Sequence, residues 1–151
     1  VDEVSRLMKQ KLEEKHLSIK TSFSPMICEL KADRDQLRQV LLNVVHNAID
    51  ATPAGGQPIE VATHELLRNE RPGTVIQVRD AGSGIPQELL PHVFEPFMTF
   101  GKRSGTGLGL AICKNIVESH EGDIYVASEV GKGTTIGIWL PFEQDLSPHK
   151  G

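Results

Sequence analysis

The feature that most constrains this chain is one long amphipathic segment, residues 33–52. Its apolar residues follow the i, i+3, i+4, i+7 spacing of a helix with one buried face: Leu37, Val40, Leu41, Val44, Val45, Ala48 and Ile49. Asp33 is suited to cap the first turn, and Gln36 can complete a capping box. Pro53 and the glycines after it end the pattern. The segment therefore predicts a long helix packed on a core.

Polar residues lie along one edge of this apolar stripe. At 100° per residue, Asn43, Asn47 and Asp50 line up beside the buried face. Asparagine is a poor helix former, so two in mid-helix require a reason. Carboxamide oxygens can ligate a hard cation, and Mg²⁺ takes few protein ligands and leaves its other positions to water and phosphate. We therefore expect a cation site at this edge.

Alternating, β-branched runs predict strands over 17–24, 59–67, 74–80, 123–130 and 134–140. Turn signals at Arg71-Pro72-Gly73 and Gly131-Lys132-Gly133 make two hairpins of the last four. A second helix is expected over 107–120, with inward residues Leu108, Ala111, Ile112 and Ile116. This mixture predicts an α/β two-layer sandwich, a mixed sheet with helices on one face.

Composition restricts the function. The chain has 151 residues and a net charge of -4, which fits one domain and disfavours nucleic-acid binding. No apolar run approaches a membrane span, so we expect a soluble domain that makes no membrane contact. Cys28 and Cys113 have no CxxC spacing and are interpreted as reduced core thiols in a cytoplasmic protein, although a disulfide between them stays open.

Two glycine-rich elements predict ligand contacts. Gly105, Gly107 and Gly109 precede a helix, where backbone N–H groups and the helix dipole favour phosphate. Their spacing fits neither a Walker loop nor a Rossmann fingerprint. Asp80 ends a strand before Gly82 and Gly84, and its carboxylate can accept from an amino group such as that of adenine. The alternative is an ordinary strand-ending turn.

In this order the elements resemble the ATP-binding catalytic domain of sensor histidine kinases, in the Bergerat-fold GHKL superfamily. Residues 35–52 resemble the N box, 80–85 the first glycine box, 94–97 (FEPF) the F box and 105–110 (GTGLGL) the second glycine box. The last hairpin resembles the closing hairpin of that domain. The resemblance implies a mostly antiparallel sheet and a flexible ATP lid over residues 86–106.

The resemblance also implies residue roles. Asn47 would chelate Mg²⁺, and Asn43 would support the phosphates or the metal's water. Asp80 would bind the adenine amino group, and Thr134 would help to hold Asp80 or an adenine-bound water. Phe94 would pack the lid. The remaining ATP-binding residues are expected to be Gly82, Gly84, Ile85, Phe97, Lys102, Arg103, Gly105, Thr106, Gly107, Leu108 and Gly109.

Three positions depart from the family pattern. Ala81 replaces a common Asn, Asp50 stands where many relatives carry Lys, and the lid lysine is shifted to Lys102, which leaves open whether Lys102 or Arg103 meets the phosphates. The gyrase and chaperone ATPases carry a Glu as general base where this chain has Asn43, which cannot accept a proton. This favours a kinase over an ATPase or clamp of the same superfamily. A degenerate interaction module that binds no nucleotide is a second alternative, supported only by Ala81 and the shifted lid lysine.

The domain boundaries and partners follow from the resemblance. Residues 1–142 would form the catalytic domain and 143–151 a flexible tail. None of the six histidines lies in a His-Glu segment of the phosphorylated kind. No catalytic residue is therefore expected in this chain, and the acceptor histidine would lie upstream on a dimerisation domain. The implied partners are that domain and a response regulator, with a homodimeric intact protein, a monomeric fragment and membrane anchoring left open.

Overall fold

The computed structural model describes residues 6–23, 33–96 and 109–142 of the chain. In chain order its elements are α2 (Lys9–Lys15), β1 (Ile19–Phe23), α3 (Arg34–Ala51), β2 (Ile59–Arg68), β3 (Arg71–Asp80), the 3₁₀ helix η1 (Leu90–His92), α4 (Gly109–Ser119), β4 (Asp123–Glu129) and β5 (Gly133–Pro141). The expected tail over 143–151 and residues 97–106 of the expected lid lie outside the described residues.

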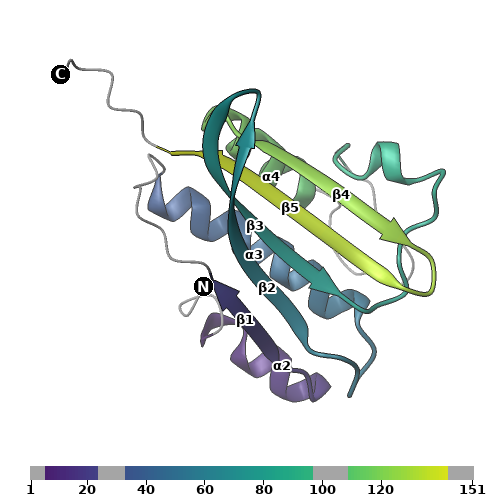
Figure 1. Cartoon of the computed structure of the whole chain (residues 1–151). Helices are drawn as coiled ribbons and strands as arrows, with labels where there is room; N and C mark the ends of the chain where they lie inside the picture. Colours follow the sequence, from purple (N-terminus) through teal and green to yellow (C-terminus); the bar gives the residue numbers. More distant parts are fainter. Residues whose placement is uncertain (1–5, 24–32, 97–108, 143–151) are drawn as a thin grey trace.

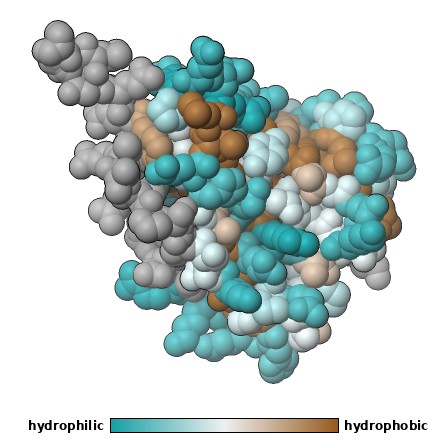
Figure 2. All heavy atoms as spheres, in the orientation of Figure 1, coloured by the Kyte–Doolittle hydropathy of each residue, from teal (hydrophilic) through white to brown (hydrophobic). Residues whose placement is uncertain are grey.

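The strands form one sheet in the order β1-β2-β3-β5-β4. β1 pairs in parallel with β2, and the other pairings are antiparallel. Figure 1 shows α3 and α4 packed along one face of the sheet, with α2 beside β1 at its edge. Hydrophilic and hydrophobic residues are interspersed on the face seen in Figure 2. The predicted two-layer α/β sandwich, with a mixed, mostly antiparallel sheet and helices on one face, is confirmed.

The long predicted helix is α3. Only one of the two hydrogen bonds of the expected capping box forms at its first turn. The Asp33 carboxylate accepts from the Gln36 backbone N–H at 3.0 Å. The backbone N–H of Asp33 donates to Nε2 of His120, also at 3.0 Å, so the return arm of a capping box is replaced by a contact from the end of α4. Thr52 is extended and ends the helix before Pro53.

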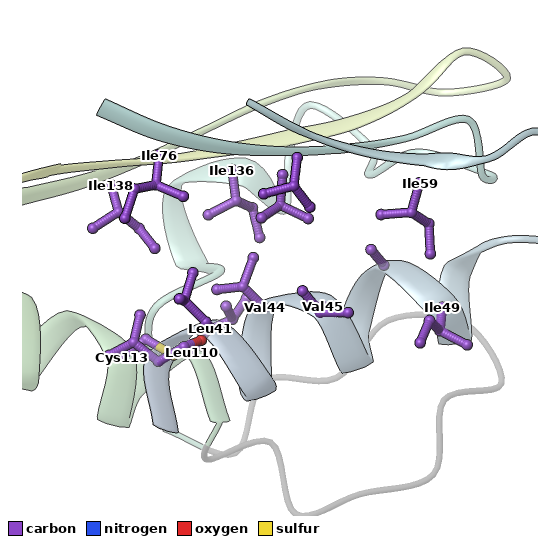
Figure 3. Close-up of a cluster of buried hydrophobic side chains, with 14 of the residues drawn as sticks. Leu41, Val44, Val45, Ile49, Ile59, Ile76, Leu110, Cys113, Ile136 and Ile138 are labelled. Carbon is purple, nitrogen blue, oxygen red and sulfur yellow. The ribbon is translucent and has the colours of Figure 1, made fainter. Parts of the chain in front are cut away.

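The core lies between α3 and the sheet. Val40, Val44, Val45 and Ile49 of α3 are at most 2% exposed, as their helical spacing predicts. Figure 3 shows the side chains of α3 pointing toward isoleucines of the sheet, with Leu110 and Cys113 of α4 beside them. The labelled sheet residues are Ile59, Ile76, Ile136 and Ile138. This packing fixes the face of α3 that meets the sheet, and with it the polar edge.

The turn of the β2–β3 hairpin is not where the sequence placed it. Asn69 and Glu70 both have positive φ, 51° and 65°, as in the two-residue turns that match strand twist. Pro72 and Gly73 instead belong to β3. A Cβ on Gly73 would lie 2.7 Å from the Trp139 ring, so this glycine makes room for a packed side chain and does not mark a turn.

The helix predicted over 107–120 is described from Gly109, and its buried face differs from the expected one. Leu110, Cys113 and Val117 are buried at i, i+3, i+7 spacing. Ile112 was expected inward but is 37% exposed, because it lies about 160° from the buried Leu110 around the helix. Ala111 is buried and Ile116 is partly buried, as predicted, and Leu108 lies outside the described residues.

Candidate functional site

A pocket opens between α3, the first turn of α4 and the sheet. Counting the open space at its mouth, it encloses about 350 Å³ of empty space. Figure 3 labels Val44, Leu110 and Ile136, which belong to its apolar walls. The full lining is Val44, Asn47, Ala48, Ala51, Val78, Asp80, Ile85, Leu110, Thr134 and Ile136. The pocket is therefore mainly apolar, with three polar side chains.

Asp80 ends β3 at this pocket and is 7% exposed. Its Oδ1 accepts from the Gly82 backbone N–H at 2.9 Å, which holds the carboxylate in a tight turn. A Cβ on Gly82 would lie 2.2 Å from the Ala51 carbonyl oxygen, so the loop packs directly on the end of α3. Gly84 has φ +79°, and a Cβ on it would lie as close, 2.2 Å, to the Glu129 carbonyl oxygen. Both glycines thus shape the loop beside Asp80.

A row of polar side chains crosses three strands at the end of the pocket. Asp80 of β3 is the register partner of Thr134 of β5, which is the partner of Ser128 of β4. The Ser128 and Thr134 hydroxyl oxygens are 2.7 Å apart. Ser128 Oγ also accepts from the Ile85 backbone N–H at 2.8 Å and donates to the Gly133 carbonyl at 2.9 Å. Thr134 is only 8% exposed. Its hydroxyl is therefore held in place by Ser128.

Sequence reasoning missed Ser128. It is not part of any glycine box, and serine is an ordinary strand-end residue. The signal was present, because the Gly131-Lys132-Gly133 turn sets a register that places Ser128 opposite Thr134. The apolar lining of the pocket was predicted as core only in part, from the spacing of Val44 and Ala48.

The two asparagines of α3 occupy different places. Asn47 lines the pocket. Asn43, one turn earlier, is outside its lining and reaches the start of α4, where its Nδ2 donates to the Gly109 carbonyl at 3.5 Å. Asn47 therefore faces the pocket, while Asn43 lies where α3 meets the first residue of α4.

Asp50 does not join this polar edge, contrary to the helical-wheel expectation. Its Oδ1 lies 3.0 Å from the Lys11 ammonium of α2, and its Oδ2 lies 3.2 Å from Nδ1 of His46. Nε2 of His46 is 2.6 Å from the same ammonium. His46 is therefore half-buried in the contact between α2 and α3. These three side chains form a cluster outside the pocket lining.

Cys113 lies behind Asn43 in the core. Burial raises the pKa of its thiol from 9.0 to about 11, and a hydrogen bond from Asn43 opposes part of that effect. The thiol is free and buried, as predicted for a core cysteine. Cys28 lies outside the described residues.

Phe94, the first residue of the F box, lies among the described residues. Phe94 packs against the core, and the Lys114 ammonium of α4 lies 5.9 Å from the centroid of its ring. The other expected lid and phosphate contacts lie outside the described residues: Phe97, Lys102, Arg103, Gly105, Thr106, Gly107 and Leu108. Their roles stay predictions.

Residues 32–144 match the family described as histidine kinase-, DNA gyrase B- and HSP90-like ATPase. The chain belongs to this family. Among solved structures of histidine kinases, the nucleotide-free catalytic domain of ThkA superposes on this chain with a TM-score of 0.79 at 31% identity. The match covers 93% of this chain and 88% of that one. Full-length ShkA in complex with AMPPNP has a TM-score of 0.79 at 28% identity, over 97% of this chain and 30% of that one.

Curated relatives of this ATPase-family domain are sensor kinases. Sporulation kinase C of Bacillus subtilis is 39% identical over 118 residues, 78% of this chain and 26% of that protein. Sensor histidine kinase ZraS of Escherichia coli is 41% identical over 136 residues, 90% of this chain and 28% of that protein. The chain thus spans about a quarter of these relatives. The predicted resemblance to a histidine kinase ATP-binding domain is confirmed.

No helix among the described residues is long and apolar enough to cross a membrane.

Proposed function

We propose that this domain binds ATP with Mg²⁺ in the pocket and presents the γ-phosphoryl group to a histidine on a separate dimerisation domain. From there the phosphoryl group would pass to an aspartate on a response regulator. The intact protein would act as a homodimer with this domain in the cytoplasm, and the domain alone would be a monomer.

The observation that carries the proposal is the buried carboxylate of Asp80 in an otherwise apolar pocket. Apolar walls suit a flat aromatic base, and a carboxylate accepts hydrogen bonds only. The adenine amino group is a donor of the right kind, and Thr134 beside Asp80 adds a second hydrogen-bonding group. The domain therefore has a base site at the sheet and a phosphate site toward α4.

The chemistry of the donor set fits Mg²⁺. The described residues contain no group of three or more His, Cys, Asp or Glu side chains that could hold a metal by themselves. Asn47 supplies one neutral carboxamide oxygen, and Mg²⁺ typically completes its octahedron with phosphate oxygens and water. When bound, the ion would neutralise phosphate charge, while Asn47 orients it.

Asn43 supports phosphoryl transfer over hydrolysis. A carboxamide cannot take a proton from water, and here its Nδ2 donates to the backbone at Gly109. Phosphoryl transfer depends mainly on positioning and charge stabilisation, so the nucleophile can come from another domain. Asn43 would hold the start of α4, where the phosphate-binding glycines lead into the helix.

Several histidines of the domain have structural contacts, which supports an external acceptor. The ring of His46 bridges α2 and α3. His120 accepts from the Asp33 backbone, and its Nδ1 lies 2.8 Å from the Ile116 carbonyl. Phosphorylating Nε2 of either ring would break a contact between elements, and phosphorylating Nδ1 would break a contact within its own helix or helix end.

The test supplies γ-labelled ATP, Mg²⁺ and a separately made acceptor-helix domain from a histidine kinase. Acid-labile phosphohistidine on that domain is the expected result. Steady phosphate release by this domain alone would favour the ATPase alternative. Failure to bind ATP in calorimetric titrations, with or without Mg²⁺, would favour an interaction module and overturn the proposal.

A further inference from the structure

The hydroxyl group of Ser128 has its single proton committed. The Gly133 carbonyl, 2.9 Å from Oγ, has no proton and can only accept, so the Ser128 proton is spent on that hydrogen bond. The Ile85 N–H, 2.8 Å away, can only donate, and it takes one lone pair of Ser128. The remaining contact of Ser128 is with Thr134.

This accounting favours Thr134 as the donor in its contact with Ser128, a pair in which either hydroxyl could donate. Its Oγ1 lies 2.7 Å from Ser128 Oγ, and two hydroxyl oxygens at that distance need one proton between them. Because Ser128 has none left, Thr134 donates to Ser128. The Thr134 hydroxyl can then offer only lone pairs on its other sides.

Thr134 lines the pocket beside Asp80, its register partner on β3. An ionised carboxylate also offers only lone pairs. The sheet end of the pocket is therefore an acceptor-only surface. A base edge carrying an amino group satisfies it, whereas a carbonyl oxygen at the same place would face lone pairs and lose the hydrogen bonds of a buried polar group.

We propose that Ser128 is a positioning residue that sets purine specificity by orienting the Thr134 hydroxyl toward itself, so that the pocket accepts a 6-amino purine and rejects a 6-oxo purine. Ser128 is absent from the pocket lining and acts through Thr134. This inference rests on the proposed nucleotide-binding function and adds to it the residue that decides which base is bound.

The test compares ATP with inosine triphosphate, which carries an oxygen in place of the 6-amino group. Calorimetric titration gives the ratio of their two dissociation constants. In the wild-type domain ATP binds more tightly. In Ser128→Ala the Thr134 proton loses its acceptor and can turn into the pocket to meet a 6-oxo group. The preference for ATP should then fall about tenfold.

Three further variants separate orientation from a structural effect. Ser128→Thr keeps the hydroxyl and should restore the preference. Thr134→Val removes the oriented group, so adding Ser128→Ala in that background should leave the preference unchanged. Thr74→Val is the matched control, because it deletes another sheet hydroxyl that donates to a backbone carbonyl, that of His64 at 3.3 Å. It should leave the preference at the wild-type value.

A purely structural role of Ser128 would weaken ATP and inosine triphosphate equally, through the unpaired Ile85 N–H, and an unchanged ratio would overturn the inference. A wild-type domain that binds both nucleotides equally would also overturn it while leaving the proposed function standing. A wild-type domain that binds neither would refute both. If Ser128→Ala does not fold, Ser128→Cys, a weaker donor and acceptor, serves for the same comparison.

Discussion

Nε2 of His120 accepts a hydrogen bond from the backbone N–H of Asp33 at 3.0 Å, so the end of α4 closes the beginning of α3. The same imidazole has Nδ1 2.8 Å from the Ile116 carbonyl in the last turn of α4. With Nδ1 donating to that carbonyl, Nε2 is left as the acceptor that Asp33 needs. One ring thus connects the two helices that form walls of the pocket.

Replacing this ring should therefore loosen both helices. His120→Ala leaves the N–H of Asp33 without its partner, and we expect the free energy of unfolding to fall by about 1 kcal/mol. Urea denaturation measures the change. His64→Ala is the control, because His64 is exposed on β2 and should stay within about 0.5 kcal/mol of wild type. Equal effects of the two substitutions would show that the bridge adds nothing.

The Lys11–Asp50 contact should couple α2 to α3. Their side chains are 33% and 17% exposed, so solvent screens this pair less than a surface pair. In a double-mutant cycle with Lys11→Met and Asp50→Asn, we expect a coupling of about 1 kcal/mol by urea denaturation. The Lys132–Glu129 pair, 77% and 62% exposed, is the control and should couple more weakly. Equal couplings would contradict the prediction.

The sequence predicted the long-range order of the fold because the apolar spacing of α3 and the alternation of the strands are local patterns. It misplaced the turn between β2 and β3, because Pro72 and Gly73 are typical turn residues but lie in β3, where Gly73 makes room for Trp139. That constraint comes from β5, far along the chain, and no local pattern contains it. The exposed position of Ile112 has the same origin, since the partners of α4 decide its buried face.

For the candidate site, too, local patterns and family motifs predicted some residues, whereas contacts from distant elements decided others. Asp80, Asn47 and Thr134 were predicted through the family resemblance, and the structure places all three around one pocket. Helix geometry alone grouped Asp50 with the asparagines, but Lys11 of α2 attracts that carboxylate, and the wheel holds no information about other elements. Ser128 was missed because its role depends on a register across two hairpins.

Cys113 gives a prediction about pH. Burial raises the pKa of its thiol from 9.0 to about 11. Because the folded pKa lies above the unfolded one, the contribution of this thiol to stability is complete below pH 9.0 and is lost as the pH rises to about 11. In a Cys28→Ser background, urea denaturation should show that Cys113→Ala loses less stability than the parent between these pH values.

The same protein offers a direct check on the thiol. At pH 8 the folded thiol should react with iodoacetamide at least about a hundredfold more slowly than the urea-unfolded one, because little thiolate forms and the sulfur is covered. Cys28→Ser, Cys113→Ser protein gives the background rate. Rapid labelling of the native protein at pH 8 would contradict both statements.

Asn47 should link nucleotide affinity to magnesium. Since it is the asparagine of α3 that lines the pocket, Asn47→Ala should remove most of the difference between ATP dissociation constants measured with Mg²⁺ and with EDTA. Asp80→Asn is the matched comparison, because it should weaken ATP binding by a similar factor under both conditions while lowering the preference for ATP over GTP. Calorimetric titration of the two variants separates the metal from the base. An Asn47→Ala variant that keeps the wild-type response to Mg²⁺ would place the ion elsewhere, and Asn43 would then be the first residue to test, since it lies one turn away beside Gly109.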